Sequence, residues 1–109
     1  MSAYRPGEVV LLSFPFSDVE GVKRRPGLVL LDAGDDDIVV ARVTSQPPQA
    51  PFDVQILEWK QAGLLLPSVV RLDKVATLEK RLVGRRLGFL MQADWQRVRA
   101  KTHDLWLSI

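Results

Sequence analysis

Three groups of polar residues carry the side chains in this sequence that could act on a phosphate. They are the run Lys23, Arg24 and Arg25, the run Thr44, Ser45 and Gln46, and the pair Arg71 and Asp73. Each group lies beside an aliphatic segment, so each alone is also explained as a polar strand edge, or, for the pair, as an ion pair on one face of a strand. Guanidinium groups are planar, permanently charged donors that suit a phosphodiester. If the fold brings the three groups to one rim, they form a phosphodiester site.

Signatures of other chemistries are missing from the sequence. The chain has no cysteine, and its one histidine, His103, lies near the end of the chain beside an apolar stripe. Phosphate-binding glycine loops, nucleophile elbows and HExxH zinc motifs are absent as well. The acidic stretch 32–37 lacks the long loop and closing glutamate of a calcium-binding hand, so we expect a solvated turn there. We therefore expect no metal ion and no cofactor.

Short apolar segments between turn residues predict the elements that must position these groups. The segments 8–14, 26–31, 38–44, 52–56 and 68–72 are rich in branched apolar residues and are bounded by Gly, Pro, Asp or Ser. Pro26 suits the first position of its strand, where a missing N–H costs the ladder least. Short strands with turn-rich connections are typical of a small antiparallel β-barrel. At 109 residues, we expect a single domain over 1–109.

The last segment changes to a helical period and predicts one amphipathic helix laid on the barrel. Its start is weakly marked, because Met91 stands where a Ser or Asp cap is expected, although Asp94 places a negative charge in the first turn. Trp106 is expected to pack the helix onto the barrel. The apolar side of the helical wheel carries Trp95, Val98, Thr102, Leu105, Trp106 and Ile109, and the other side carries Arg97, Lys101 and Asp104.

The charge is unevenly divided along the chain. Residues 1–54 carry five Lys or Arg against eight Asp or Glu, whereas residues 55–109 carry ten against five. A basic half is either a binding surface for polyanions or an ordinary solvated surface. No signal architecture opens the sequence, and no apolar run approaches the roughly 18 residues of a membrane span, so a cytoplasmic protein without membrane contact is expected.

Three segments in register resemble the MazF/PemK-like toxins of type II toxin-antitoxin systems, with similarity to the Kid-like branch as well. "GEVVLLSFPFSDVEGVKRRPGLVLL" is similar to the family's first strand, loop, and arginine-proline entry into an aliphatic strand. "VARVTSQ" is similar to the ending of its third strand, and "LPSVVRLDKVATLEKRLVGRRLGFL" to its later segment with Arg-x-Asp, a short strand and a glycine-bearing turn. The resemblance covers nearly the whole chain.

The resemblance implies a mainly β fold, a small SH3-like antiparallel barrel with a C-terminal helix, in a homodimer. It also implies a metal-independent endoribonuclease that cuts single-stranded RNA and is neutralised by a cognate antitoxin. In such a reaction the 2′-OH attacks the adjacent phosphorus and leaves a cyclic phosphate and a free 5′-OH. The family's principal catalytic pair falls on Arg25 and Thr44. Lys23, Arg24, Ser45 and Gln46 are then expected to bind substrate.

The Kid-like branch implies acid and base roles for the Arg-x-Asp pair, which is Arg71 and Asp73 in this sequence. That branch also uses a histidine in the first loop, where this sequence has none. Glu20 is the nearest residue for a polar role there.

Two further hypotheses stay open from the sequence. Related toxins on this barrel act on DNA gyrase through aromatic residues near the chain's end, and Trp106, Leu107 and Ile109 occupy a comparable place. The basic second half also fits an SH3-like RNA-binding module without catalysis. That module gives no reason for Arg25 and Thr44 to occur together with Arg71 and Asp73.

Overall fold

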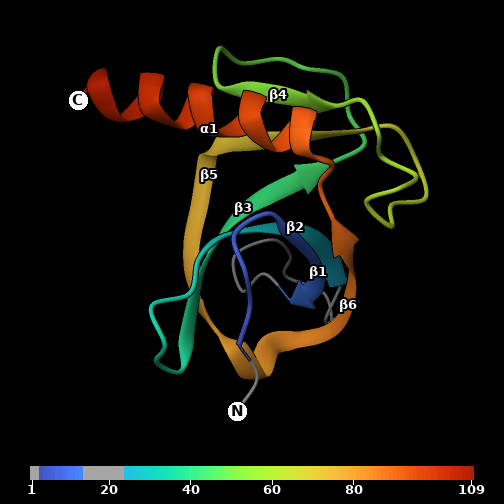
Figure 1. The fold of residues 1–109 in the computed structure, drawn as a ribbon, viewed down its shortest axis with the longest axis vertical. Helices are drawn as coiled ribbons and strands as arrows, with labels where there is room; N and C mark the ends of the chain where they lie inside the picture. Colours follow the sequence, from blue (N-terminus) through green and yellow to red (C-terminus); the bar gives the residue numbers. More distant parts are fainter. Residues whose placement is uncertain (1–2, 14–23) are drawn as a thin grey trace.

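The computed structural model describes residues 3–13 and 24–109, and this part of the chain is a β-sheet followed by one α-helix (Figure 1). The mainly β class with a C-terminal helix is therefore confirmed. The elements in chain order are β1 (Glu8–Ser13), β2 (Arg24–Leu31), β3 (Asp37–Thr44), β4 (Asp53–Ile56), β5 (Ser68–Glu79), a 3-10 turn (Lys80–Leu82), β6 (Val83–Phe89) and α1 (Gln92–Leu107).

All neighbouring strands pair antiparallel in one six-stranded sheet of order β4-β5-β3-β2-β1-β6. No ladder among the described residues joins the edges β4 and β6, so strand pairing does not close the expected barrel. The sheet curls instead, because β5 bends along its 12 residues (Figure 1). The bend coincides with a bulge, since residues 72–74 have no pairing partner on β3 between the pairs Arg42–Arg71 and Ala41–Val75. An extra run of this kind bends a strand and increases its twist.

The central strands are buried on both faces. Val9 and Leu28 enter one apolar cluster, whereas their chain neighbours Val10 and Val29 enter a second cluster. Successive residues of a strand point to opposite faces, so these two clusters lie on the two sides of the sheet. Burial on both faces explains why β2 carries an uninterrupted aliphatic run after Pro26.

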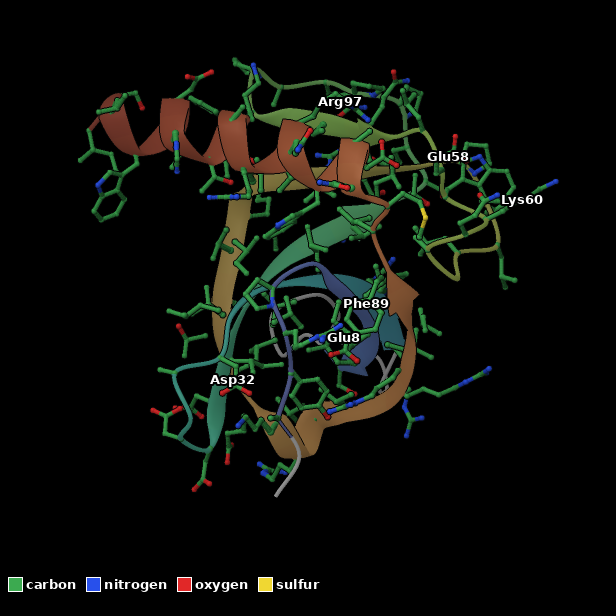
Figure 2. All side chains as sticks on the ribbon, in the orientation of Figure 1. Glu8, Asp32, Glu58, Lys60, Phe89 and Arg97 are labelled. Carbon is green, nitrogen blue, oxygen red and sulfur yellow. The ribbon has the colours of Figure 1, made fainter. Side chains whose placement is uncertain are left out.

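The start of α1 is tied to the end of β4 by a buried carboxylate. Asp94 is 1% exposed, and its two oxygens accept hydrogen bonds from the N–H groups of Leu57 at 3.1 Å and Glu58 at 2.9 Å. Arg97 bonds to Asp94 and donates to the carbonyl oxygen of Gln55 at 2.6 Å (Figure 2). The helix begins after Met91, as predicted. The burial of Asp94 was not predicted.

The last turn of the helix corrects the prediction for Trp106. Trp95 and Leu105 pack against the core and Val98 is fully buried, which confirms this part of the apolar stripe. Trp106 is 73% exposed, and Leu107 and Ile109 are more exposed still. The reason is geometric, because the C-terminal end of α1 extends past β5 (Figure 1), and Leu105 is the last residue of the helix that packs against the core.

None of the helices in the described part of the chain is long and apolar enough to span a membrane.

A turn far from α1 is held by Asp32, which follows β2 (Figure 2). Its carboxylate accepts hydrogen bonds at 2.8 Å from the N–H groups of Tyr4 and Gly34, and it pairs with Lys80 Nζ at 3.0 Å. These donors favour the ionised form, so they lower the pKa of Asp32 from 3.8 to about 2.

The depressed pKa of Asp32 predicts a stability contribution that depends on pH. The contribution is complete above pH 3.8 and disappears as the pH falls towards about 2, because the carboxyl group is then protonated in the folded state too. Asp32→Asn should therefore lower the urea midpoint at pH 7, and the gap to the parent should narrow as the pH is lowered through this window. Asp36→Asn, in the same turn but exposed, is the control. An equal, pH-independent loss in both variants would contradict the assignment.

Candidate functional site

The end of β3 and the start of β2 bring Arg25 and Thr44 together. β2 and β3 pair with Gly27 opposite Arg42 and Leu28 opposite Ala41. Continuing this register by two residues places Arg25 opposite Thr44, where cross-strand side chains are neighbours. On β3, Arg42 and Thr44 share a face by the two-residue period, opposite the face on which Ala41 and Val43 enter the core.

These side chains line a cleft of about 410 Å³. Three of its described lining residues are arginines, Arg25, Arg42 and Arg85, and none of those described is acidic. Pro26, Leu11 and Leu87 contribute an apolar wall. Several guanidinium groups line this cleft, and the described lining residues include no carboxylate. Such a cleft is suited to bind an anion. We call it the cationic cleft.

The hydroxyl group of Thr44 is oriented by the backbone that follows it. Gln46 N–H donates to Thr44 Oγ1 at 3.2 Å, which is the local turn that Ser and Thr often make at a strand end. A hydroxyl that accepts this bond still has its own hydrogen to donate. Thr44 can therefore offer a donor to an oxygen bound in the cationic cleft.

The far wall of the cationic cleft is the loop between β4 and β5, residues 57–67. The backbone of this loop contacts the backbone of β6 at Gly63 in the loop and Gly88 in the strand. A Cβ on Gly63 would lie 2.1 Å from the carbonyl oxygen of Leu87, and a Cβ on Gly88 would lie 2.7 Å from the carbonyl oxygen of Ala62. The loop presents Leu65 and Leu66 at the cleft, with exposed fractions of 91% and 57%. Large apolar side chains exposed beside a charged cleft indicate a contact surface for a ligand.

The other predicted site residues lie in different places. Arg71 does not line the cationic cleft; its Nη2 donates to Gln46 Oε1 at 3.2 Å and to Gln49 Oε1 at 3.3 Å. Asp73 is exposed in the bulge of β5, and the described residues contain no ion pair between it and Arg71.

Among the predicted substrate-binding residues, Ser45 lines the cationic cleft and Gln46 does not. Arg24 extends over β6, with its guanidinium nitrogen 2.5 Å from where a Cβ on Gly84 would be. Lys23 and Glu20 lie outside the described residues. In the described part of the chain, no group of three or more His, Cys, Asp or Glu side chains is arranged to hold a metal ion.

Sequence reasoning missed Arg42 and Arg85 as members of the site. Arg42 was detectable, because it precedes Thr44 by two residues in an alternating strand and so shares its face. Arg85 had no such signal. Its place depends on the pairing of β6 with β1, in which Arg85 is opposite Leu11.

The model of the PemK-like, MazF-like toxin family of type II toxin-antitoxin systems matches residues 5–105 of the chain. The chain therefore belongs to this family, and the resemblance read from its motifs is confirmed. A comparison with curated protein sequences found no match.

Several solved structures have the same fold. The chain is similar to an endoribonuclease in complex with its cognate antitoxin from a mycobacterial species, at 19% identity, 95% coverage of each chain and a TM-score of 0.78. It is similar to the Mycobacterium tuberculosis toxin MazF-mt6, at 22% identity, with 94% of this chain and 96% of that chain covered and a TM-score of 0.75. It is also similar to MazF from Deinococcus radiodurans, at 28% identity, full coverage of both chains and a TM-score of 0.75.

The close approach at Gly63 predicts a local weak point. Gly63 has φ +87°, and a Cβ there meets the Leu87 carbonyl, so Gly63→Ala should lower the free energy of unfolding by more than the ~1–3 kcal/mol of backbone strain alone. Gly34→Ala is the matched control, because Gly34 has φ +95° with nothing within 4 Å. Urea unfolding of both variants separates the two costs. Equal losses would mean that the loop does not depend on this contact.

Proposed function

We propose that this toxin-family chain is a metal-independent endoribonuclease that cleaves single-stranded RNA. The observation that carries the proposal is the position of Arg25 and Thr44, which come from neighbouring strands and line one cationic cleft. The family membership and the endoribonuclease among the similar structures support the same reaction class.

In the proposed reaction, the RNA 2′-OH attacks the adjacent phosphorus, a P–O bond to the 5′ oxygen breaks, and the products are a 2′,3′-cyclic phosphate and a 5′-OH. Negative charge grows on the phosphoryl oxygens in the transition state. A guanidinium group stays charged at neutral pH, so Arg25 acts as an electrostatic clamp on these oxygens. Thr44 donates a hydrogen bond to the same group. The burial of β2 beneath Arg25 limits how far this clamp can move.

Proton transfer remains a prediction from the Kid-like resemblance, which assigns it to Arg71 and Asp73. Asp73 is exposed in the β5 bulge and Arg71 binds two glutamine side chains. The cationic cleft therefore gives no support to an acid or base role for either residue. Asp73→Asn separates the alternatives. A collapse of kcat would support the base role, and an unchanged kcat would restrict the chemistry to the cleft.

The proposal includes the partners that the family implies. The similar mycobacterial endoribonuclease is bound to its cognate antitoxin. We extend such an antitoxin to this chain, together with a homodimer of single-domain protomers over residues 1–109.

A second candidate function has one observation in its favour. Trp106, Leu107 and Ile109 are exposed, so they are available for the protein contact through which related toxins act on DNA gyrase. Gyrase inhibition by the purified protein without RNA cleavage, abolished by Trp106→Ala, would favour this candidate.

The first test is cleavage of a long single-stranded RNA in EDTA. The parent should cut at defined sites, and Arg25→Ala should lower kcat by about 10²–10³-fold, the usual cost of removing a preorganised donor to an oxyanion. Thr44→Val, which removes only the hydroxyl group, should also lower kcat. Arg99→Ala is the control, because Arg99 lies on α1 and does not line the cationic cleft. Full activity in Arg25→Ala would refute the site, and an inactive parent would refute the function.

Arg42 and Arg85 are expected to bind the phosphates that flank the cleaved bond. Arg42→Gln and Arg85→Gln should each raise KM, and each should reduce the slope of log KM against log salt by about 0.7, the value for one contact to a single strand. Arg99→Gln on α1 is the control for the loss of one charge, since Arg99 does not line the cleft. Identical salt slopes in all three variants would exclude Arg42 and Arg85 from phosphate binding.

A further inference from the structure

A second pocket adjoins the cationic cleft. It has a volume of about 330 Å³ and shares Ser45 and Ser68 with the cleft. Its lining includes Gln46, Gln55 and Trp59, and the described lining residues contain no charged side chain. We call it the neutral pocket. The two cavities meet at the end of β3, where the Thr44 hydroxyl group lies.

The contrast between the two linings indicates different parts of one ligand. An uncharged pocket with amide groups, hydroxyl groups and an aromatic ring suits a planar, neutral group with a hydrogen-bonding edge. A cationic cleft suits a phosphate. A single-stranded RNA places a base beside each phosphate, and unpaired bases are commonly bound by stacking and by hydrogen bonds to their edges.

We propose that the neutral pocket binds one unpaired base of the RNA next to the phosphate in the cationic cleft, and that Gln46 selects this base. The inference rests on the proposed ribonuclease function and adds to it the residues that set sequence preference.

The amide group of Gln46 is held in one orientation by Arg71. The guanidinium group can only donate hydrogen bonds, so the Gln46 atom 3.2 Å from Arg71 Nη2 must be the carbonyl oxygen. The NH2 group of Gln46 is therefore the part left for a ligand, and it is a donor. A donor fixed in this way favours a base that presents an acceptor at that point of the pocket. Arg71 is a positioning residue in this arrangement.

Arg71 itself is placed by the sheet and by a loop. It lies opposite Asp53 in the β4–β5 ladder, so a carboxylate and a guanidinium are cross-strand neighbours. Asp53 Oδ2 also accepts hydrogen bonds from the N–H groups of Gln49 at 2.8 Å and Ala50 at 3.0 Å. The loop after β3 is thus folded back over Arg71, and both glutamine oxygens reach the same Nη2 atom.

Trp59 provides an aromatic surface in the neutral pocket. It is half-buried and packs against the core below while lining the pocket. The preceding residues Leu57 and Glu58 are held by Asp94 through their backbone N–H groups, so the Trp59 ring stands on a fixed segment. A base that stacks on a tryptophan gains affinity regardless of its identity. Trp59 should therefore contribute to affinity, and Gln46 to preference.

The decisive comparison is Gln46→Glu against Gln49→Glu, measured as cleavage-site profiles on a library of single-stranded RNA. Both variants add one negative charge and keep an oxygen for Arg71, but only Gln46 lines the neutral pocket. Gln46→Glu should change the preferred base at one position beside the cut, because a donor becomes an acceptor. Gln49→Glu should keep the preference of the parent. If both variants keep the base preference of the parent, the inference is overturned. The proposed function is unaffected by that result as long as the parent cleaves RNA.

A second measurement tests the stacking surface. Trp59→Leu should raise KM for RNA about tenfold or more, as expected for the loss of one base stack, with a smaller change in kcat. Trp106→Leu, at an exposed tryptophan on α1, is the control. Thermal unfolding shows whether each variant is folded. An unchanged KM in folded Trp59→Leu overturns the inference. The inference is also overturned if Trp59→Leu loses antitoxin binding without any change in RNA cleavage. A parent that neither binds nor cuts RNA refutes the proposed function instead.

Discussion

The buried carboxylate of Asp94 joins the two layers of the molecule and holds the segment on which both cavities depend. It binds the first two N–H groups of the β4–β5 loop and the Arg97 side chain, which in turn reaches the β4 carbonyl of Gln55. A buried carboxylate is costly unless several donors satisfy it, so its removal would leave two backbone N–H groups without their partner. The loop that starts at this contact carries Trp59 into the neutral pocket and Leu65 and Leu66 to the cationic cleft.

The loop is held at a second point farther along. Gly63 and Gly88 let the backbone of the loop meet that of β6 with no side chain between them. A segment fixed at its start by a charge and near its middle by backbone contact loses much of its freedom. This explains how a connection without regular secondary structure forms a wall for two cavities. Neither anchor includes Arg25 or Thr44, so the walls of the cavities and the proposed catalytic pair are held by separate contacts.

The sequence was sufficient where local pattern decides the outcome. Aliphatic runs between breakers located β1 to β4 within a few residues, and the change of period located α1. Arg25 and Thr44 were expected at one rim because each stands at a strand end in a family motif, and both do line the cationic cleft. Their catalytic roles stay a prediction. The length of β5 was not predicted, because its second half alternates around a bulge whose pairing with β3 is a long-range property.

What local pattern could not supply is the surroundings of each side chain. The wheel position of Trp106 is that of a buried residue, but its burial depends on where the sheet ends beneath the helix, and α1 extends past that edge. Arg71 was paired with Asp73 from their spacing, although the i,i+2 arrangement says nothing of the Gln46 and Gln49 amides that return from another loop. Arg85 reaches the cationic cleft only through the pairing of β6 with β1.

Under the proposed function, the division between sheet and loop also separates chemistry from selectivity. Arg25, Arg42 and Thr44 stand on strands buried on both faces, where a change of position would disturb the core. Gln46 and Trp59 stand on loops, where substitutions are tolerated as long as the anchoring contacts remain. Sequence preference can therefore change by exchange of loop residues while the phosphate clamp stays in place.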